Sequence, residues 1–179
     1  RAPTWPGAVR VGWAHSPRRA RVVRESGVDA VGGSGFGVSA AHAVREANVL
    51  SVSENLAIAA GTTRAIDVPV IADWDSGFGN AVNVIRTVRD YEAAGVAGIC
   101  IEDNVFPKRC SFYDSSWREL ASPEEHAGKI RAACDARRDP NTVIIARTEA
   151  LIAGHGMAEA LLRARAYADA GADAVLIHS

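Results

Sequence analysis

The chain has 179 residues, of which 48% are hydrophobic and 23% charged, enough for one well-packed domain. Its formal net charge is only −1 at pH 7 and its basic residues are scattered, which argues against nucleic acid and membrane surfaces as partners. The three cysteines, Cys100, Cys110 and Cys134, have no CxxC spacing and no signal peptide is visible, so we expect reduced thiols and a cytoplasmic protein.

Short apolar segments alternate with helical patterns along the chain. We predict strands at residues 9–14, 30–33, 68–73, 98–102, 143–147 and 174–178. Continuous apolar runs of this length are typical of parallel strands that are buried on both faces. A glycine that can end a helix stands shortly before three of these strands, at Gly27, Gly95 and Gly171. The pattern therefore predicts a series of β-α units.

Capping residues mark several helix starts. Ser16 and Ser122 each precede a proline that suits the first helical turn, and Asn80 can cap a helix that runs to about Ala94. Residues 104–121 instead form a long stretch of mixed chemistry between a strand and a helix. Loops of that length are commonly functional, so we predict that residues 104–121 gate an active site.

Polar side chains follow or end nearly every predicted strand. They are His15, Ser34, Asp73, Glu102, Arg147 and His178. An open doubly wound sheet gathers its ligand chemistry near one switch point, whereas a closed ring places functional groups at every strand end. We therefore predict an α/β fold of the (β/α)8 TIM-barrel type, with residues 1–179 as a single domain. A complete barrel takes about 250 residues, so we expect only the first six β-α units here and a longer natural protein.

Asp73 and Asp75 follow the third apolar segment closely, and Glu102 ends the fourth. Carboxylates crowded at neighbouring strand ends repel one another and lose hydration, and a hard divalent cation offsets that cost. Ligation by oxygen alone favours Mg²⁺ or Mn²⁺ over zinc. The simpler alternative is that these acids cap helices or satisfy backbone groups, and Asp73 and Asp75 share a face only if the strand stays regular. The pattern predicts a metal-dependent enzyme.

Four motifs stand in one order along the chain, at Asp73–Asn80, Glu102–Ser111, Ala146–Gly154 and Ile177–Ser179. Together they resemble the phosphoenolpyruvate mutase/isocitrate lyase superfamily. The resemblance implies a (β/α)8 barrel that exchanges a helix between subunits and assembles as a homodimer or homotetramer. It also implies an enzyme that binds Mg²⁺ and a small α-keto or enolate acid, and that makes or breaks a P–C or C–C bond.

The resemblance also implies roles for individual residues at the strand ends. Asp73 would be the principal Mg²⁺ ligand and would approach the substrate, with Asp75 and Glu102 acting directly or through water. The turn of Ser34, Gly35 and Phe36 resembles the family's Ser-Gly-Leu/Phe turn, which holds the substrate carboxylate. A glycine-flanked turn can aim backbone N–H groups at an anion, although it is also a common way to make an ordinary tight turn.

Three basic residues complete the implied site. Arg147 would contact a phosphoryl or carboxylate group, His178 would donate to the phosphoryl group, and Lys108 would add positive charge when its loop closes. Each has a simpler alternative. Arg147 could form a structural salt bridge with Glu149, His178 could be a satisfied core histidine, and Lys108 could be a solvated surface lysine.

The loop combines features of different subfamilies. Cys110 follows a Lys-Arg pair as in the C–C lyases, where this cysteine is the general acid. The Gly-His that follows the cysteine in those enzymes is replaced here by Ser111 and Phe112. Glu46 stands where the mutases have an aspartate and is a further candidate catalytic residue.

A P–C enzyme needs cationic and hydrogen-bonding groups around a metaphosphate-like unit, which Arg147 and His178 can supply. Cys110 would lack its usual supporting histidine. We therefore predict interconversion of phosphoenolpyruvate and phosphonopyruvate. The alternatives are a phosphonopyruvate hydrolase, an isocitrate lyase-type C–C lyase acting on a 2-hydroxy or 2-methyl di- or tricarboxylate, and a barrel that serves only as a binding module.

Overall fold

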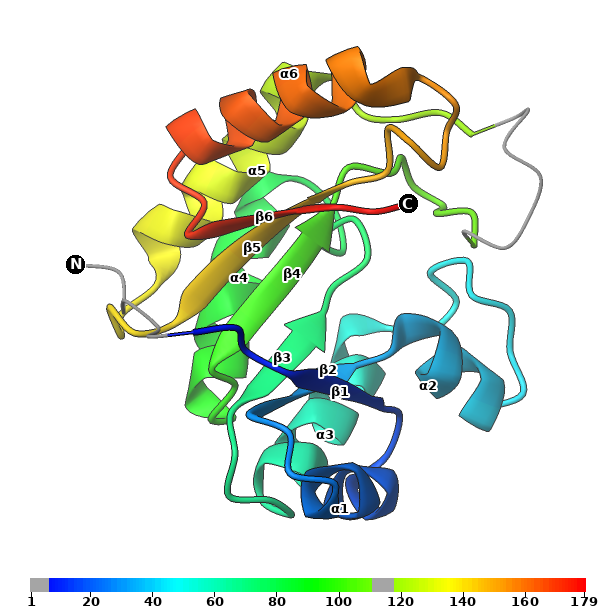
Figure 1. Cartoon of the computed structure of the whole chain (residues 1–179), viewed down its shortest axis with the longest axis vertical. Coiled ribbons are helices and arrows are strands. Elements are labelled where there is room, and N and C mark those ends of the chain that lie inside the picture. Colours follow the sequence, from blue (N-terminus) through cyan, green and yellow to red (C-terminus); the bar gives the residue numbers. More distant parts are fainter. Residues whose placement is uncertain (1–6, 111–117) are drawn as a thin grey trace.

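The computed structural model describes residues 7–110 and 118–179 of the chain. Within them, six parallel strands form one sheet in the order β1-β2-β3-β4-β5-β6 (Figure 1). The elements, in chain order, are β1 Val11–Ala14, α1 Pro17–Glu25, β2 Ala30–Gly33, α2 Gly35–Ala41, α3 Val52–Thr63, β3 Val70–Asp73, α4 Ala81–Ala93, β4 Gly98–Glu102, α5 Pro123–Ala136, β5 Val143–Thr148, α6 Gly156–Asp169 and β6 Ala174–Ile177.

The predicted architecture is confirmed as a partial barrel of alternating strands and helices. Each strand pairs in parallel with the strand before it in sequence, as in a TIM-type barrel, and β1 and β6 form the two edges. The third strand starts at Val70 rather than at residue 68, just after Pro69, which has no N–H to give to a strand ladder. Of the predicted 104–121 loop, residues 111–117 lie outside the described residues.

The predicted helix caps are confirmed. The Ser16 hydroxyl accepts a hydrogen bond from the Arg19 N–H at 3.3 Å, and the Ser122 hydroxyl accepts one from the Glu125 N–H at 3.1 Å. Asn80 caps α4 by accepting from the Val82 N–H at 2.9 Å. Each cap satisfies a backbone donor that the first helical turn leaves unpaired. Helices α2 and α3, which lie between β2 and β3, were not predicted.

The main core lies between the sheet and helices α4, α5 and α6, which Figure 1 shows packed beside β3 to β6. Alternate residues of the central strands point into it. They are Ala72 on β3, Ile99 and Ile101 on β4, and Ile144 and Ala146 on β5, and all are buried. Full burial of an isoleucine-sized side chain is worth about 1.5–3 kcal/mol, so this face accounts for much of the stability. The residues between them point to the inner face of the sheet.

Candidate functional site

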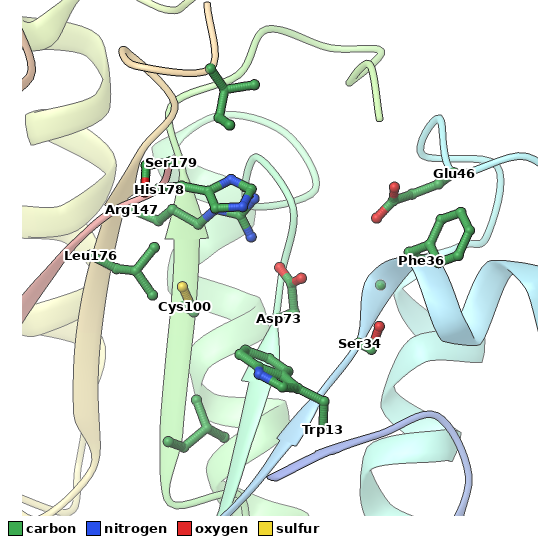
Figure 2. A pocket seen from close by; sticks show the side chains of 13 residues that line it. Trp13, Ser34, Phe36, Glu46, Asp73, Cys100, Arg147, Leu176, His178 and Ser179 are labelled. Carbon is green, nitrogen blue, oxygen red and sulfur yellow. The ribbon is translucent and has the colours of Figure 1, made fainter. Parts of the chain in front are cut away.

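A cavity of about 560 Å³ lies on the inner face of the sheet. Strand residues form its walls: Trp13 from β1, Ile71 from β3, Cys100 from β4 and Leu176 from β6. Most of the predicted site residues line it as well, namely Ser34, Gly35, Phe36, Glu46, Asp73, Arg147 and His178. Figure 2 shows Asp73 between Arg147 and His178 on one side and Ser34, Phe36 and Glu46 on the other. The strand ends therefore gather acids and cations around one hollow.

The acidic side chains meet although the third strand does not stay regular. It ends at Asp73, and Asp75 adopts a left-handed conformation with φ of 48° in the turn that follows. The Asp75 N–H donates to Asp73 Oδ1 at 3.1 Å. A methyl group built at Gly35 would lie 3.2 Å from an Asp75 oxygen, 3.3 Å from a Glu46 oxygen and 3.4 Å from an Asp73 oxygen. The turn thus brings together carboxylates that an extended strand would have spread out.

Lys108 lies among these acids rather than on the surface. Its Nζ is 2.6 Å from Asp75 Oδ1, 3.1 Å from Glu46 Oε1 and 3.2 Å from Glu102 Oε1. Burial alone would lower the pKa of Lys108, but the surrounding negative charges raise it well above its usual range. The ammonium group is therefore charged, and the alternative of a solvated surface lysine is wrong.

The acids pay an electrostatic cost for this crowding. Burial raises the pKa of Asp75 to about 7, and the charges of Asp73 and Glu102 act in the same direction against that of Lys108. Loss of surrounding water also raises the pKa of Asp73, again opposed by Lys108. Lys108 and Arg147 carry two positive charges against the four carboxylates of Glu46, Asp73, Asp75 and Glu102, so the cluster can accept additional positive charge.

Asn48 is a site residue that the sequence analysis missed. Its Nδ2 donates to Asp75 Oδ2 at 3.1 Å, and its Oδ1 accepts from the Lys108 N–H at 2.5 Å. It has a left-handed backbone with φ of 55°, which asparagine tolerates better than most residues. Asn48 thus fixes Lys108 and Asp75 relative to each other, and no local sequence pattern signals a contact between residues so far apart.

The donor groups suit a hard divalent cation. The candidates Asp73, Asp75 and Glu102 offer carboxylate oxygens only, and Glu102 Oε2 is buried with no hydrogen-bond partner among the described residues. Across residues 7–110 and 118–179, however, no three His, Cys, Asp or Glu side chains already form a cage for a metal ion. Asp75 and Glu102 converge instead on the Lys108 ammonium group. Their role as metal ligands stays a prediction.

Arg147 and His178 lie together on one wall of the cavity. Arg147 Nη2 lies 2.8 Å from His178 Nδ1, and Arg147 Nη1 lies 3.5 Å from Glu102 Oε2, its neighbour in the strand ladder. Glu149 Oε1 contacts Arg147 Nε at 2.5 Å and His178 Nδ1 at 2.8 Å. The alternative of a salt bridge between Arg147 and Glu149 is therefore confirmed, yet Arg147 also lines the cavity.

The remaining predicted residues fall into two groups. Ser34, Gly35 and Phe36 stand where β2 passes into α2, so they form a helix start rather than an isolated tight turn. The Ser34 hydroxyl accepts from the Gly37 N–H at 3.1 Å and is partly occupied by that cap. Cys110 is only 1% exposed and does not line the cavity, and its carbonyl accepts from Arg118 at 2.8 Å. The structure does not place the Cys110 thiol at the cavity wall.

In the described parts of the chain, no helix is both long and apolar enough to cross a membrane. The family model for phosphoenolpyruvate phosphomutase matches residues 7–179. The 2,3-dimethylmalate lyase of Eubacterium barkeri is 48% identical over 93% of this chain, which corresponds to 57% of the lyase.

Two solved structures match closely. Phosphoenolpyruvate phosphomutase from Streptomyces platensis subsp. rosaceus superimposes with a TM-score of 0.95 at 50% identity, covering 98% of this chain and 61% of that one. Phosphonopyruvate hydrolase in complex with oxalate and Mg²⁺ gives a TM-score of 0.87 at 48% identity, covering 94% and 57%. This chain thus spans less than two thirds of each relative. By sequence and by fold, the chain belongs to the phosphoenolpyruvate phosphomutase family.

Proposed function

We propose that the full-length protein is a Mg²⁺-dependent phosphomutase that interconverts phosphoenolpyruvate and phosphonopyruvate. The observation that carries this proposal is the pairing of Arg147 with His178 on the cavity wall, 2.8 Å apart and facing the side of Asp73 (Figure 2). A guanidinium group and an imidazole together suit the three oxygens of a phosphoryl group. A cavity of about 560 Å³ is ample for a three-carbon acid that carries one such group.

The acidic cluster supports a metal-assisted reaction. Asp73, Asp75 and Glu102 would hold the ion, and the excess of carboxylates over nearby cations favours its binding. When bound, a divalent cation supplies positive charge to the keto-acid oxygens and to the enolate that forms as the P–C bond breaks. The solved relative that contains oxalate and Mg²⁺ carries ligands of this chemical kind.

The chain's own residues would then act on the phosphoryl group. Arg147 and His178 would donate hydrogen bonds to its oxygens as it leaves carbon and bonds to the enolate oxygen, so that no atom is gained or lost. Lys108 contacts Asp75 and Glu102, and these ion pairs would hold the chain around Lys108 over the acids. Such anchoring would limit the access of water, which would otherwise capture the phosphoryl group.

The position of Cys110 favours P–C chemistry over the lyase reaction. A C–C lyase needs an acid that protonates a carbanion, and a thiol can do so only if it reaches the substrate. Cys110 is buried outside the cavity wall, and its carbonyl is tied to Arg118. We therefore expect Cys110→Ala to keep most of the activity, whereas it would abolish a lyase reaction that used this thiol.

Phosphorus NMR of the full-length protein with phosphonopyruvate and Mg²⁺ tests the proposal. A phosphoenolpyruvate signal is expected. Free phosphate and pyruvate would indicate a hydrolase instead, since water rather than the enolate would then have taken the phosphoryl group. Failure to convert phosphonopyruvate, together with cleavage of 2,3-dimethylmalate, would overturn the proposal in favour of a lyase.

A thermal-stability titration provides a separate test of the metal site. Mg²⁺ should raise the Tm of the wild-type protein by mass action, because only the folded state assembles the carboxylates. Asp73→Asn should remove most of that increase. The matched control is Asp90→Asn, which neutralises an exposed acid of the Arg86 ion pair on α4 and should leave the Mg²⁺ effect unchanged.

A further inference from the structure

Glu149 is fully buried, yet it contacts both basic residues of the cavity wall, Arg147 and His178. We propose that Glu149 is a positioning residue that aims Arg147 and His178 at one point of the cavity and keeps the proton of a neutral His178 on Nδ1. The effect on turnover rests on the proposed function, whereas the effect on His178 does not. Glu149 was considered from the sequence only as a salt-bridge partner of Arg147.

A single oxygen of Glu149 holds both partners. Glu149 Oε1 lies 2.5 Å from Arg147 Nε and 2.8 Å from His178 Nδ1. The guanidinium and imidazole groups are thereby brought side by side, with Arg147 Nη2 2.8 Å from His178 Nδ1. Figure 2 shows the two side chains lying together on the cavity wall, on the side that faces Asp73. One carboxylate oxygen thus contacts both side chains and holds them next to each other.

The contacts also constrain the proton on His178. Its Nδ1 lies 2.8 Å from a carboxylate oxygen, which can only accept, and 2.8 Å from a guanidinium nitrogen, which can only donate. A lone pair on Nδ1 would face the negative charge of Glu149, whereas an N–H there makes a charge-assisted hydrogen bond. Arg147 retains a direct hydrogen bond to the same oxygen through Nε. The arrangement therefore favours the proton on Nδ1.

Glu149 is a charged group throughout the ordinary pH range. Burial alone would raise its pKa, but the hydrogen bond from His178 and the positive charge of Arg147 lower the pKa of Glu149 to about 2. Its second oxygen, Oε2, lies 3.8 Å from Arg118 Nη1. The carboxylate can therefore act as a permanent acceptor for its two partners.

The backbone around Glu149 is fixed by a second buried acid. The Glu149 N–H donates to Asp103 Oδ1 at 2.9 Å, and the Thr148 hydroxyl donates to Asp103 Oδ2 at 2.8 Å. The His178 N–H donates to the Thr148 carbonyl at 3.1 Å. The ends of β5 and β6 are thereby tied together, so the Glu149 carboxylate has a defined position from which to orient its partners.

The functional consequence concerns the other ring nitrogen. With Nδ1 held against Glu149, Nε2 is the nitrogen left for a ligand, and a protonated ring would donate from Nε2 to an anionic oxygen. Arg147 approaches from the same wall. A substrate phosphoryl group would then meet two donors whose relative position is set before binding, and such preorganised donors carry much of the effect in electrostatic catalysis.

Nitrogen-15 NMR of ligand-free, histidine-labelled full-length protein at pH 8.5 tests the inference, with His178→Gln used to identify the His178 signals. Wild type should carry the proton on Nδ1. In Glu149→Gln the negative charge that favours an N–H at Nδ1 is gone, and Nδ1 can accept a hydrogen bond from Arg147 instead. The proton of the neutral ring should therefore move to Nε2. A wild-type proton on Nε2 alone, or an Nδ1 proton that persists in Glu149→Gln, would overturn the proposal. This readout needs no substrate and decides the role of Glu149 even if the proposed reaction fails.

Kinetics with phosphonopyruvate provide the second readout. Glu149→Gln should lower kcat on the order of 10²- to 10³-fold, because the neutral amide no longer holds the Arg147 and His178 side chains in the positions from which they meet the phosphoryl group, with KM changed by less than about fivefold. The matched control is Glu159→Gln, which makes the same chemical change at the Arg163 ion pair on α6 and should leave kcat and the His178 proton unchanged. A kcat within about threefold of wild type in Glu149→Gln would contradict the role in turnover.

Discussion

Two buried acids at the end of β4, Asp103 and Glu102, differ in how completely their carboxylate oxygens are hydrogen-bonded. On the outer side, Asp103 accepts from the Thr148 hydroxyl, the Glu149 N–H, Arg163 and the Tyr167 hydroxyl, at 2.7–3.1 Å. On the inner side, Glu102 Oε2 has no hydrogen-bond partner among the described residues, and its ion-pair contact with Arg147 Nη1 is 3.5 Å long. A fully hydrogen-bonded acid ties structural elements together, whereas an acid with an unused oxygen still has room to accept a further hydrogen bond or ion.

Substitution of Asp73 should have the largest effect on activity and a smaller, opposite effect on stability. The pKa of Asp73 is raised, chiefly by loss of water, so its charged form destabilises the folded protein at neutral pH, and stability is lost as pH rises through that pKa. Asp73→Asn should therefore raise the free energy of unfolding of the metal-free protein at pH 7 by about 1–2 kcal/mol. The same change should lower kcat/KM about 10³-fold or more, because Asp73 is the proposed principal metal ligand and the loss of one electrostatic group from an active site commonly costs about that much.

Denaturant unfolding without Mg²⁺, followed by phosphorus NMR assays with it, measures both quantities in one variant. A variant that loses activity but is also less stable would show that Asp73 is a structural acid. Asp90→Asn serves again as the exposed control, because its ion pair with Arg86 is worth little.

Removal of the fully hydrogen-bonded acid, Asp103, should lower the stability of the protein, whereas removal of Asp73 should raise it. Asp103→Ala leaves Arg163 and the Tyr167 hydroxyl buried without this acceptor, so the free energy of unfolding should fall by about 3–5 kcal/mol. Tyr167→Phe removes only one of these bonds and should cost about 1 kcal/mol. Urea unfolding of the full-length variants checks both values. Equal losses in the two variants would show that the acid does not organise the cluster.

His126 offers a smaller test on the outer side. It is fully buried, packs edge-on against Tyr167, and neither ring nitrogen has a hydrogen-bond partner among the described residues. Burial lowers the pKa of His126 to about 4, with Lys129 and Arg163 acting in the same direction and Asp103 opposing. The unfolded chain takes up a proton near pH 6.5 while the folded protein does not, so stability is lost as pH falls from about 6.5 to 4.

His126→Phe keeps a ring against Tyr167 and removes this proton uptake. The difference in unfolding free energy between wild type and variant should therefore change by up to about 3 kcal/mol between pH 7 and pH 4, in favour of the variant at low pH. Urea unfolding at several pH values measures it. Parallel pH profiles for the two proteins would contradict a neutral buried ring.

Much of the outer face could be predicted from the sequence. Apolar runs located all six strands, and the caps at Ser16, Asn80 and Ser122 located three helices. These signals are local, because each depends on residues within one or two turns of the chain. The parallel order followed from the β-α repeat, since consecutive units pack side by side.

The inner face could be predicted only in part. Sequence motifs indicated which acids and cations gather there, but not that Lys108 would be buried among the acids, because lysine is almost always exposed unless paired. Asn48 was missed because its two partners, Asp75 and Lys108, are distant in sequence. Helices α2 and α3 were missed as well, in a region that includes left-handed residues at Ala43 and Asn48.

The absence of a side chain at Gly35 bears on which ion the proposed site would select. A methyl group there would press on oxygens of Asp73, Asp75 and Glu46 and push them outward by a few tenths of an ångström. Mg²⁺ demands near-ideal octahedral bonds of about 2.0–2.1 Å, whereas Ca²⁺ accepts about 2.3–2.6 Å and irregular geometry. Gly35→Ala should therefore shift the preference from the smaller ion toward the larger one, as calorimetric titration with each ion would reveal. The lack of a methyl group at Gly35 would thus keep the carboxylate oxygens close enough together to favour the ion of smaller radius.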